Sequence, residues 1–388
     1  MKPDIEIFMF IDALGWNTVS HTNFMADLLP HRKPVVMQFG YSSSAIPTIL
    51  SGKTPAEHGH LGLFRFAPHD SPFKKMGWLE KIMVPKSFWR RGRIRHWLSK
   101  AVKRLYGFTG YFQLYQMPFA KLGMMDYCEK YDLFAHHGLG DIENLRDMLE
   151  KSGLQFHISD WHLSDEENVA LACKAIEKGC RFLFIYNAAF DGFMHDHVGD
   201  WDAIPQKLEW YKSKIKSVIS CCEGLGKSVR FTLFSDHGMT PLAATVDIKS
   251  KVDACGLVFG KDYGACYDST MARFTYLQPS AKEKIHSVLE TFNSSGHWLS
   301  QDEERKYGIF REDRLFGDEF FFVNPGIQIV PSDMGSKPLN GMHGFEPNEE
   351  YSLAMIMSND AIPDYILTVA DYFRLMRERA DELAKENG

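Results

Sequence analysis

Four short apolar runs occur along the chain, separated by segments in which apolar and polar residues alternate at helical spacing. The runs are IEIFMFI, LQFHI, RFLFIY and VRFTLF, at residues 5–11, 154–158, 181–186 and 229–234. Continuous apolar runs of this length are typical of strands that are buried on both faces of a parallel sheet. The helical patterns cover residues 141–153, 165–179 and 204–224. This alternation predicts an α/β fold, with a mostly parallel central sheet and helices on both of its faces.

Residues 66–135 interrupt the alternation. They are rich in aromatic residues and in Lys and Arg, which suggests a cap inserted into a single α/β domain spanning residues 1–388. The last segment, residues 364–388, has the pattern of a surface helix that ends in a polar tail. No internal repeat divides the chain further.

Charge is unevenly distributed. The chain has a net charge of −6, but residues 74–104 contain eleven Lys or Arg and one acid, Glu80. This segment therefore carries +10 and the remainder −16. Its bases alternate with aromatic residues, which predicts attraction of a small anionic substrate or, less strongly, contact with an anionic membrane surface. The alternative is a helix whose bases face water or pair with acids elsewhere in the chain. Nucleic acid is not expected as a partner.

The composition is that of an ordinary globular protein, with 45% hydrophobic and 24% charged residues. The seven cysteines are odd in number, include the adjacent pair Cys221 and Cys222, and show no CxxC spacing. Reduced thiols in a cytoplasmic protein are therefore expected. No segment reaches the roughly 18 uncharged apolar residues needed to span a bilayer.

Carboxylates and imidazoles follow three of the predicted strands. Asp12 follows the first, NAAFDGFMHDH follows the third, and SDHGMT follows the fourth. A further imidazole, His343, lies between glycines in NGMHGFEP. Parallel sheets bind ligands at the carboxyl ends of their strands. This mixture of ligands suits Zn²⁺, with Mn²⁺ as the alternative, and is large enough for two ions, which together can assist displacement at phosphorus.

The stretch FGYSSSAIPTILSG, residues 39–52, places three serines before a short apolar segment and a glycine. Its simplest interpretation is a helix that the serines cap, with Pro47 in its first turn and Gly52 just past its end.

Five motifs resemble those of the alkaline phosphatase superfamily, and within it the type I phosphodiesterase/nucleotide pyrophosphatase family. They are IDALG, SSSAIPTILSGKTPAEHG, DGFMH, SDHGM and GMHGF, in the family's order between residues 12 and 345. The family's nucleophile lies ten residues before the helix-ending glycine, and counting back from Gly52 reaches Ser42. The resemblance implies that Ser42 is the nucleophile, while Ser43 or Ser44 keeps the capping role.

The resemblance also implies two groups of metal ligands. One group consists of Asp191, His195 and His343, and the other of Asp12, Ser42, Asp236 and His237. The family's HxxG spacing after the first histidine is not met, because Gly199 lies four residues after His195. This departure leaves His197 as an alternative to His195.

Two further departures concern the substrate. The sulfatase motif CxPSR is absent at Ser42, which disfavours sulfate esters. The asparagine that nucleotide pyrophosphatases carry after HG is also missing, since Leu63, Phe64 and Arg65 occupy this region. The resemblance therefore implies a two-metal hydrolase that cleaves a phosphodiester, or a related phosphate ester or pyrophosphate, through a covalent phosphoseryl intermediate. Alternatives are a phosphomonoesterase, a phosphonate hydrolase or a phosphotransferase with the same site, or a non-catalytic anion-binding protein.

Overall fold

The computed structural model of the protein describes residues 3–76, 86–89 and 91–385. Its largest sheet has six strands in the order β2-β16-β7-β1-β6-β5. These strands are β2 (His31–Val35), β16 (Ala354–Ser358), β7 (Val229–Phe234), β1 (Ile5–Ile11), β6 (Phe182–Asn187) and β5 (Phe156–Ile158). Strands β7, β1, β6 and β5 are parallel, while β16 is antiparallel to both of its neighbours. The predicted mostly parallel sheet is confirmed.

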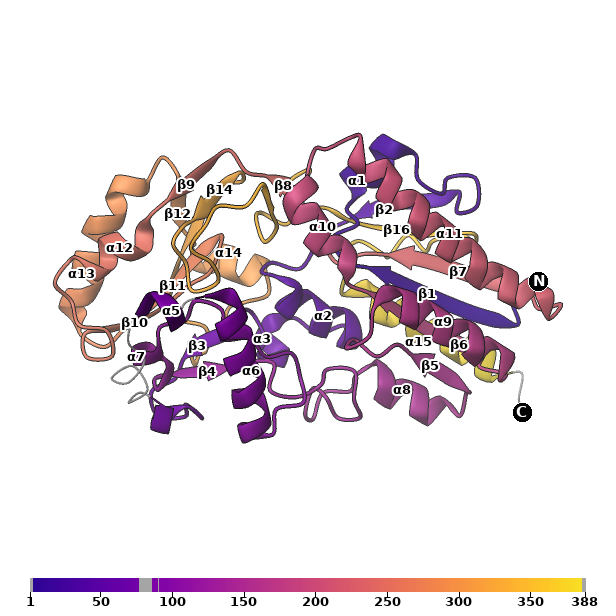
Figure 1. Ribbon diagram of the computed structural model, residues 1–388, viewed down its shortest axis with the longest axis horizontal. Coiled ribbons are helices and arrows are strands. Elements are labelled where there is room, and N and C mark those ends of the chain that lie inside the picture. The colour runs from indigo at the N-terminus through magenta and orange to yellow at the C-terminus, as the bar shows by residue number, and fades with distance from the viewer. Residues whose placement is uncertain (1–2, 77–85, 90, 386–388) are drawn as a thin grey trace.

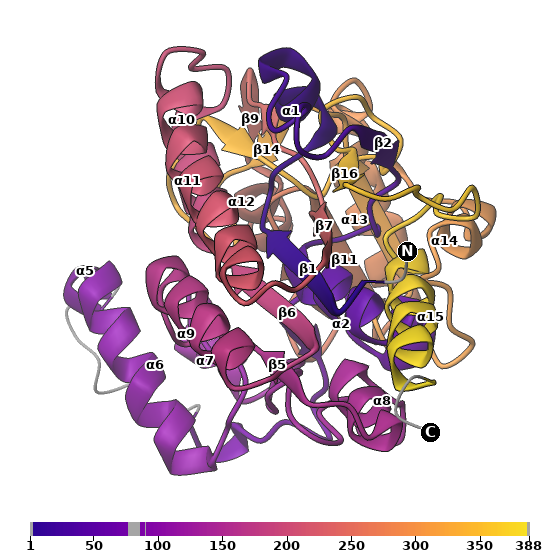
Figure 2. The same cartoon turned by 90° about the vertical axis from the view of Figure 1, so that its right-hand side faces the viewer.

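Helices cover both faces of this sheet (Figures 1 and 2). Side chains alternate along β1, so Ile7 and Met9 pack with α9 (Asp165–Glu177) and α11 (Ala203–Gly224) in one core. Phe8 and Phe10 pack on the other face, in a core that also contains residues of three further helices. These helices are α2 (Ser42–Ser51), α8 (Leu145–Ser152) and α15 (Asp371–Ala384). Because both faces of β1 are covered, its whole length is buried.

The boundaries agree closely with the sequence pattern, with a few differences. The predicted helix 141–153 begins at Leu145, because the side chain of Asn144 accepts a hydrogen bond from the N–H of Asp147 and caps the first turn. Helix α15 is not a surface helix along its length, since Tyr372, Leu375 and Met376 are buried against the sheet. All seven cysteines are free thiols, as expected. None of the helices in the described part of the chain is long and apolar enough to cross a bilayer.

A second sheet is antiparallel and has four strands in the order β10-β11-β13-β12. They are β10 (Tyr263–Tyr267), β11 (Met271–Tyr276), β13 (Glu319–Val323) and β12 (Gly296–Trp298). Helices α12 (Ile248–Asp253) and α13 (Pro279–Leu289) pack against it and enclose a separate apolar core. The apolar runs of the sequence did not predict this sheet.

The basic, aromatic segment 66–135 lies beside the second sheet in Figure 1. It contains α5 (Lys86–Trp89), α6 (Gly92–Tyr106), α7 (Phe119–Leu122) and β4 (Met125–Tyr127), which pairs with β3 (Phe64–Phe66). Phe73, Phe112 and Leu122 belong to a small apolar core that also includes Cys266 of β10. Residues 77–85 and 90, which include Trp78 and Arg90, lie outside the described residues. The role of the segment as a cap stays a prediction.

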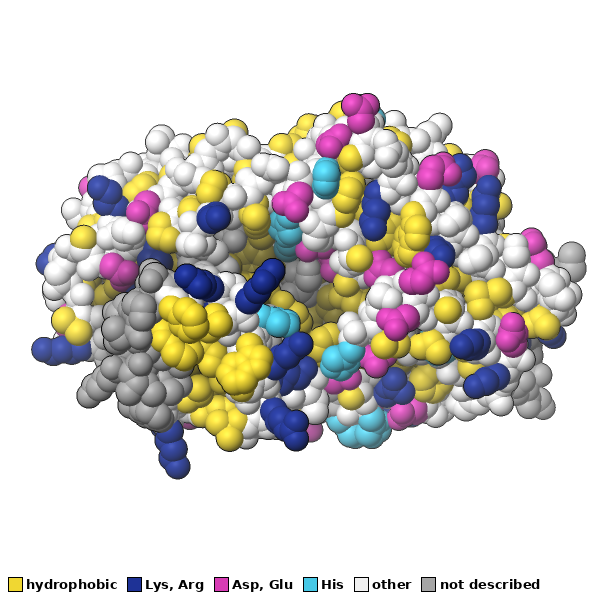
Figure 3. All heavy atoms as spheres, viewed as in Figure 1, with side chains coloured by type: hydrophobic (Ala, Val, Ile, Leu, Met, Phe, Trp, Pro, Cys, Tyr) yellow, Lys and Arg dark blue, Asp and Glu magenta, His cyan; other side chains and the backbone are white. Residues whose placement is uncertain are grey.

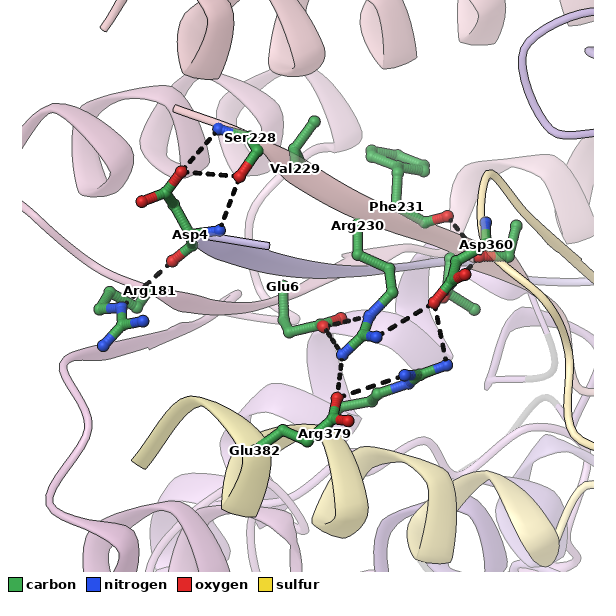
Figure 4. Close-up of polar contacts among 12 residues, drawn as sticks. Asp4, Glu6, Arg181, Ser228, Val229, Arg230, Phe231, Asp360, Arg379 and Glu382 are labelled. Carbon is green, nitrogen blue, oxygen red and sulfur yellow. Dashed lines mark hydrogen bonds and ion pairs between the residues drawn. The ribbon is translucent and has the colours of Figure 1, made fainter. Parts of the chain in front are cut away.

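An ion-pair network holds the amino end of β1 (Figure 4). Arg230 on β7 donates to Glu6 on β1, to Asp360 after β16, and to Glu382 on α15. Glu6 is fully buried. The network thus ties two strands and the last helix together at the end of β1 opposite Asp12.

Candidate active site

The strand-end residues identified in the sequence meet at one edge of the parallel sheet. Asp12 follows β1, and Asp236 and His237 follow β7. Helix α10 (Ala189–His197), which follows β6, carries Asp191 and His195. A short pairing between β8 (Thr240–Pro241) and β15 (Gly341–Met342) brings the His343 loop to the same edge. The strand ends converge as expected for a parallel sheet.

One group at this edge consists of Asp12, Asp236 and His237. His237 Nε2 lies 3.2 Å from Asp236 Oδ2 and 3.5 Å from Asp12 Oδ1. All three side chains are buried. Ser42 Oγ lies 3.1 Å from the same Nε2 atom, so its hydroxyl faces this group.

A second group consists of Asp191, His195 and His343. His195 Nε2 is 3.4 Å from Asp191 Oδ2, and His343 Nε2 is 3.6 Å from Asp191 Oδ1. The rings of His343 and His237 stack with their centroids 3.8 Å apart, which places the two groups side by side.

Backbone carbonyls orient two of the imidazoles. His195 Nδ1 lies 2.8 Å from the carbonyl oxygen of Gly341, and His237 Nδ1 lies 2.8 Å from that of Gly238. A neutral ring that donates its Nδ1–H to a carbonyl leaves a lone pair on Nε2. Both Nε2 atoms face the carboxylates, which is the orientation of metal-binding histidines.

Uncompensated carboxylate oxygens indicate what this edge can bind. Asp12 Oδ1, Asp191 Oδ1 and Asp236 Oδ2 are buried and accept no hydrogen bond from the described residues, although an imidazole Nε2 lies 3.2 to 3.6 Å from each. Burial and the nearby carboxylate of Asp236 raise the pKa of Asp12 well above its usual value, and burial also raises that of Asp236. Burying such oxygens is costly, and a divalent cation would offset the cost. The two groups therefore fit divalent metal ions.

The three serines of residues 42–44 have different surroundings. Ser44 Oγ accepts from the N–H of Tyr41, which precedes α2, and lies 2.9 Å from the Phe39 carbonyl. Ser43 Oγ donates to the carbonyl of Leu61. Only Ser42, the first residue of α2, directs its hydroxyl at the carboxylate and imidazole groups.

The ends of α2 partly match the sequence pattern. Gly52 follows the helix with φ +69°, as predicted for its end. Pro47, however, is the sixth helical residue and lies in the second turn rather than the first. The reason is that the helix begins at Ser42, so the serines form its first turn instead of preceding it.

The His343 loop approaches the serine loop so closely that only glycine fits. Gly344 has φ +88°, and a Cβ there would lie 2.7 Å from the carbonyl oxygen of Gly40. Thr270 supports this arrangement, since it donates to the carbonyl of Gly344 and its N–H donates to the Tyr41 hydroxyl. The pattern of the sequence did not identify Thr270 or Tyr41.

His197, the alternative to His195, belongs to neither group. Its Nδ1 lies 3.1 Å from Asp200 Oδ2, and its ring stacks on Phe193 with 4.4 Å between centroids. It is also 42% exposed. The geometry therefore favours His195 as the histidine of α10 that faces the site.

A pocket of about 860 Å³ opens over Ser42 and Asp191. Figure 3 shows a hollow near the centre of this face, between the positions of α6 and α10. The wall away from the strand ends includes Lys100 of α6 and four residues that the sequence pattern did not single out. These are Tyr111, Tyr115, Glu129 and Trp161. The richness of residues 66–135 in aromatics was a sign of Tyr111 and Tyr115 in the sequence, but Trp161 lies outside that segment.

The sequence matches the family model described as type I phosphodiesterase / nucleotide pyrophosphatase over residues 7–382. It matches none of the curated proteins with which it was compared. Among solved structures it is similar to murine ectonucleotide pyrophosphatase / phosphodiesterase 5, with a TM-score of 0.66 and 12% identity over 98% of this chain and 95% of that chain. An inactive form of the murine protein in complex with AMP gives the same values. The human protein gives a TM-score of 0.67 and 11% identity over the same shares of the two chains. At these identities the likeness concerns the fold.

Proposed function

The chain belongs to the type I phosphodiesterase/nucleotide pyrophosphatase family, and from this premise we propose that it is a metal-dependent hydrolase with Ser42 as its nucleophile. Its substrate is a phosphodiester or a related phosphate ester. The observation that carries this proposal is the position of the Ser42 hydroxyl, 3.1 Å from His237 Nε2 and next to two groups of buried carboxylates and imidazoles.

Two divalent ions, Zn²⁺ or Mn²⁺, held by the two groups would supply positive charge that lowers the pKa of the Ser42 hydroxyl and stabilises charge on the phosphoryl oxygens. The residues proposed to hold them are Asp12, Ser42, Asp236 and His237 for one ion and Asp191, His195 and His343 for the other.

The chain itself provides the nucleophile and part of the phosphate site. The Ser42 hydroxyl loses its proton to solvent as Oγ bonds to phosphorus, the bond from phosphorus to the leaving alkoxide breaks, and the alkoxide takes up a proton from solvent. The oxygen of a water molecule then bonds to phosphorus, the bond from phosphorus to Ser42 Oγ breaks, and Oγ takes up the proton that the water loses. Ser42 is the first residue of α2, so the positive end of the helix favours the anionic phosphoryl group at this position.

The substrate class is supported by the family and by one structural neighbour. That neighbour is described in complex with AMP, which is consistent with a nucleotide or another phosphate ester here. Phosphomonoesterase, phosphonate hydrolase and phosphotransferase activities use the same chemistry and remain alternatives. The cytoplasmic location stays a prediction.

Metal analysis of the purified protein, followed by a paired assay, tests the proposal. We expect tightly bound divalent metal and faster hydrolysis of bis(4-nitrophenyl) phosphate than of 4-nitrophenyl phosphate. Faster hydrolysis of the monoester would instead indicate that the protein is a phosphomonoesterase. A metal-free protein that hydrolyses neither compound after metal is added would overturn the proposal.

A further inference from the structure

Glu129 is a buried carboxylate without a partner in the wall of the active-site pocket. It follows β4, lines the pocket and is 8% exposed. Its carboxylate makes no hydrogen bond or ion pair with any described residue. Asp126, three residues earlier, is 2% exposed but lies 2.7 Å from Arg65 Nη2 and 3.0 Å from Lys130 Nζ. The nearby bases therefore neutralise Asp126 and leave Glu129 unpaired.

This arrangement is costly for the free protein. Burial raises the pKa of Glu129 to about 8, since a carboxylate that leaves water without a partner favours its neutral form. A cation entering the pocket would offset this cost by restoring a counter-charge. Lys100 does not supply this counter-charge, because it lines the pocket but is exposed to solvent at its rim.

Aromatic side chains share this wall with Glu129. Tyr111, Tyr115 and Trp161 line the pocket. Burial raises the pKa of both tyrosines, and the nearby carboxylate of Glu129 adds to the effect. Their hydroxyls are 2.6 Å apart, which fixes one ring relative to the other. Tyr115 has φ +41°, a strained conformation for a bulky residue and one that is typical of functional sites. The Trp161 ring already lies against Lys103 Nζ, 4.9 Å from its centroid. The two tyrosine rings beside the carboxylate are favourable surroundings for an ammonium group.

We propose that this wall is a subsite for a positively charged ammonium group of the substrate, with Glu129 as its counter-charge. The inference rests on the proposed function, because the same pocket contains Ser42 and Asp191. A ligand that places its phosphoryl group at Ser42 and its ammonium group at Glu129 is a phosphodiester of an amino alcohol. Exposed Lys100 attracts the phosphate anion at the mouth of the pocket, whereas Glu129 binds the cation inside it.

Two substrates that differ by one atom test the subsite. They are 4-nitrophenyl phosphocholine and 4-nitrophenyl 3,3-dimethylbutyl phosphate, in which carbon replaces the ammonium nitrogen. We expect the wild-type protein to prefer the zwitterionic ester, which carries the ammonium group, by roughly tenfold or more in kcat/KM. Glu129→Gln should remove most of this preference, mainly by raising KM for the ester that carries the ammonium group. Glu283→Gln, which changes an exposed carboxylate outside this pocket, is the matched control.

These experiments can refute the ammonium subsite without refuting the proposed hydrolase activity. If wild-type protein hydrolyses both esters equally well, or if Glu129→Gln slows both equally, the proposed subsite is refuted and the proposed hydrolase activity is not. If Glu129→Gln retains the preference, other side chains recognise the ammonium group and the proposed counter-charge is refuted. Calorimetric titration of the wild-type protein with choline and with 3,3-dimethylbutanol needs no turnover. Stronger binding of choline supports the subsite, and equal or absent binding of the two overturns it.

Discussion

Three consecutive serines with the same side chain have three different environments at the start of α2. Ser44 bonds to backbone groups of the loop before α2 and Ser43 to the backbone carbonyl of Leu61 after it, whereas the Ser42 hydroxyl faces the carboxylate and imidazole groups. The composition of the stretch predicts only a capped helix. The ten-residue spacing to Gly52 selected Ser42, and the geometry agrees with that selection, although its role as nucleophile is still a proposal.

Removing one member of each group tests the metal sites. Asp236→Asn and His343→Ala should each lower bound metal and hydrolysis together, since each loses a proposed ligand. A chelator should inactivate the wild-type protein, and added Zn²⁺ or Mn²⁺ should restore it. Metal analysis and diester hydrolysis measure both effects. His197→Ala is the control, because His197 pairs with Asp200 outside both groups. Loss of metal in this control would instead assign His197 as the ligand.

Glu129 also predicts a dependence of stability on pH. Its folded pKa of about 8 lies above the ordinary value of 4.5, so the folded protein retains a proton that the unfolded chain has released. Ionisation of Glu129 therefore lowers the free energy of unfolding as pH rises from about 4.5 to 8, by at most about 1.4 kcal/mol per pH unit. Glu129→Gln should raise the free energy of unfolding more at pH 8 than at pH 5. Urea unfolding at the two pH values measures this difference, and equal gains would contradict the prediction.

At the scale of elements, β1 connects the site to the rest of the sheet. Its carboxyl end places Asp12 in the site, and its amino end is held by the network around Arg230. Apolar periodicity predicted this strand and β7 with their correct limits. It could not predict the ion pairs at the amino end, because the partners come from β7, the loop after β16, and α15.

Removing the partner of a buried charge should destabilise the fold. Arg230→Met leaves Glu6 fully buried without its base, which should lower the free energy of unfolding by about 3–5 kcal/mol. Lys53→Met is the control: Lys53 and Glu57 form an ion pair with both side chains about half exposed, a kind of pair that contributes less than about 1 kcal/mol. Urea unfolding measures both variants. A similar small decrease in the free energy of unfolding in the two variants would show that the network contributes little to stability.

The basic residues of helix α6 do not all face solvent. Arg95 is buried, donates to the carbonyls of Trp89 and Met117, and lies over the ring of Phe119. It therefore supports packing and cannot act as a surface charge, contrary to the sequence-based expectation for the whole segment. Trp97 and Leu105 are 68% and 74% exposed on the same helix. Contact with an anionic membrane stays a prediction.

The exposed bases of α6 should affect substrate capture. Neutralising Arg93, Lys100 and Arg104 together to Gln should raise KM for an anionic diester several-fold at low salt, with kcat nearly unchanged. The effect should shrink at high salt because of screening. Steady-state kinetics at two ionic strengths measure it. Neutralising the exposed Lys216, Lys261 and Lys284, which do not line the pocket, changes the net charge equally. An equal increase in KM in the two triple variants would show that net charge alone causes the effect.

At the scale of the whole molecule, the sequence predicted the parallel sheet better than the rest of the protein. Strands such as β1 are buried on both faces, so their pattern does not depend on their partners. In the antiparallel sheet, β10 and β11 are neighbours in sequence, but β11 also pairs with β13, which lies more than 40 residues later in the chain, so this pairing depends on tertiary contacts. Glu129 shows the same limit at a single position. Nothing in its local sequence indicates that it faces the pocket that contains Ser42.

The kinetics of Ser42→Ala test the main proposal most directly, with bis(4-nitrophenyl) phosphate as substrate and bound metal measured in the same samples. We predict that kcat falls by several orders of magnitude while the fold and most of the bound metal are retained, because the hydroxyl that attacks phosphorus is lost. Ser43→Ala, whose hydroxyl bonds to the Leu61 carbonyl, should stay within a few-fold of the wild type. Near wild-type turnover in Ser42→Ala, or inactivation by Ser43→Ala instead, would contradict the assignment of Ser42 as the nucleophile.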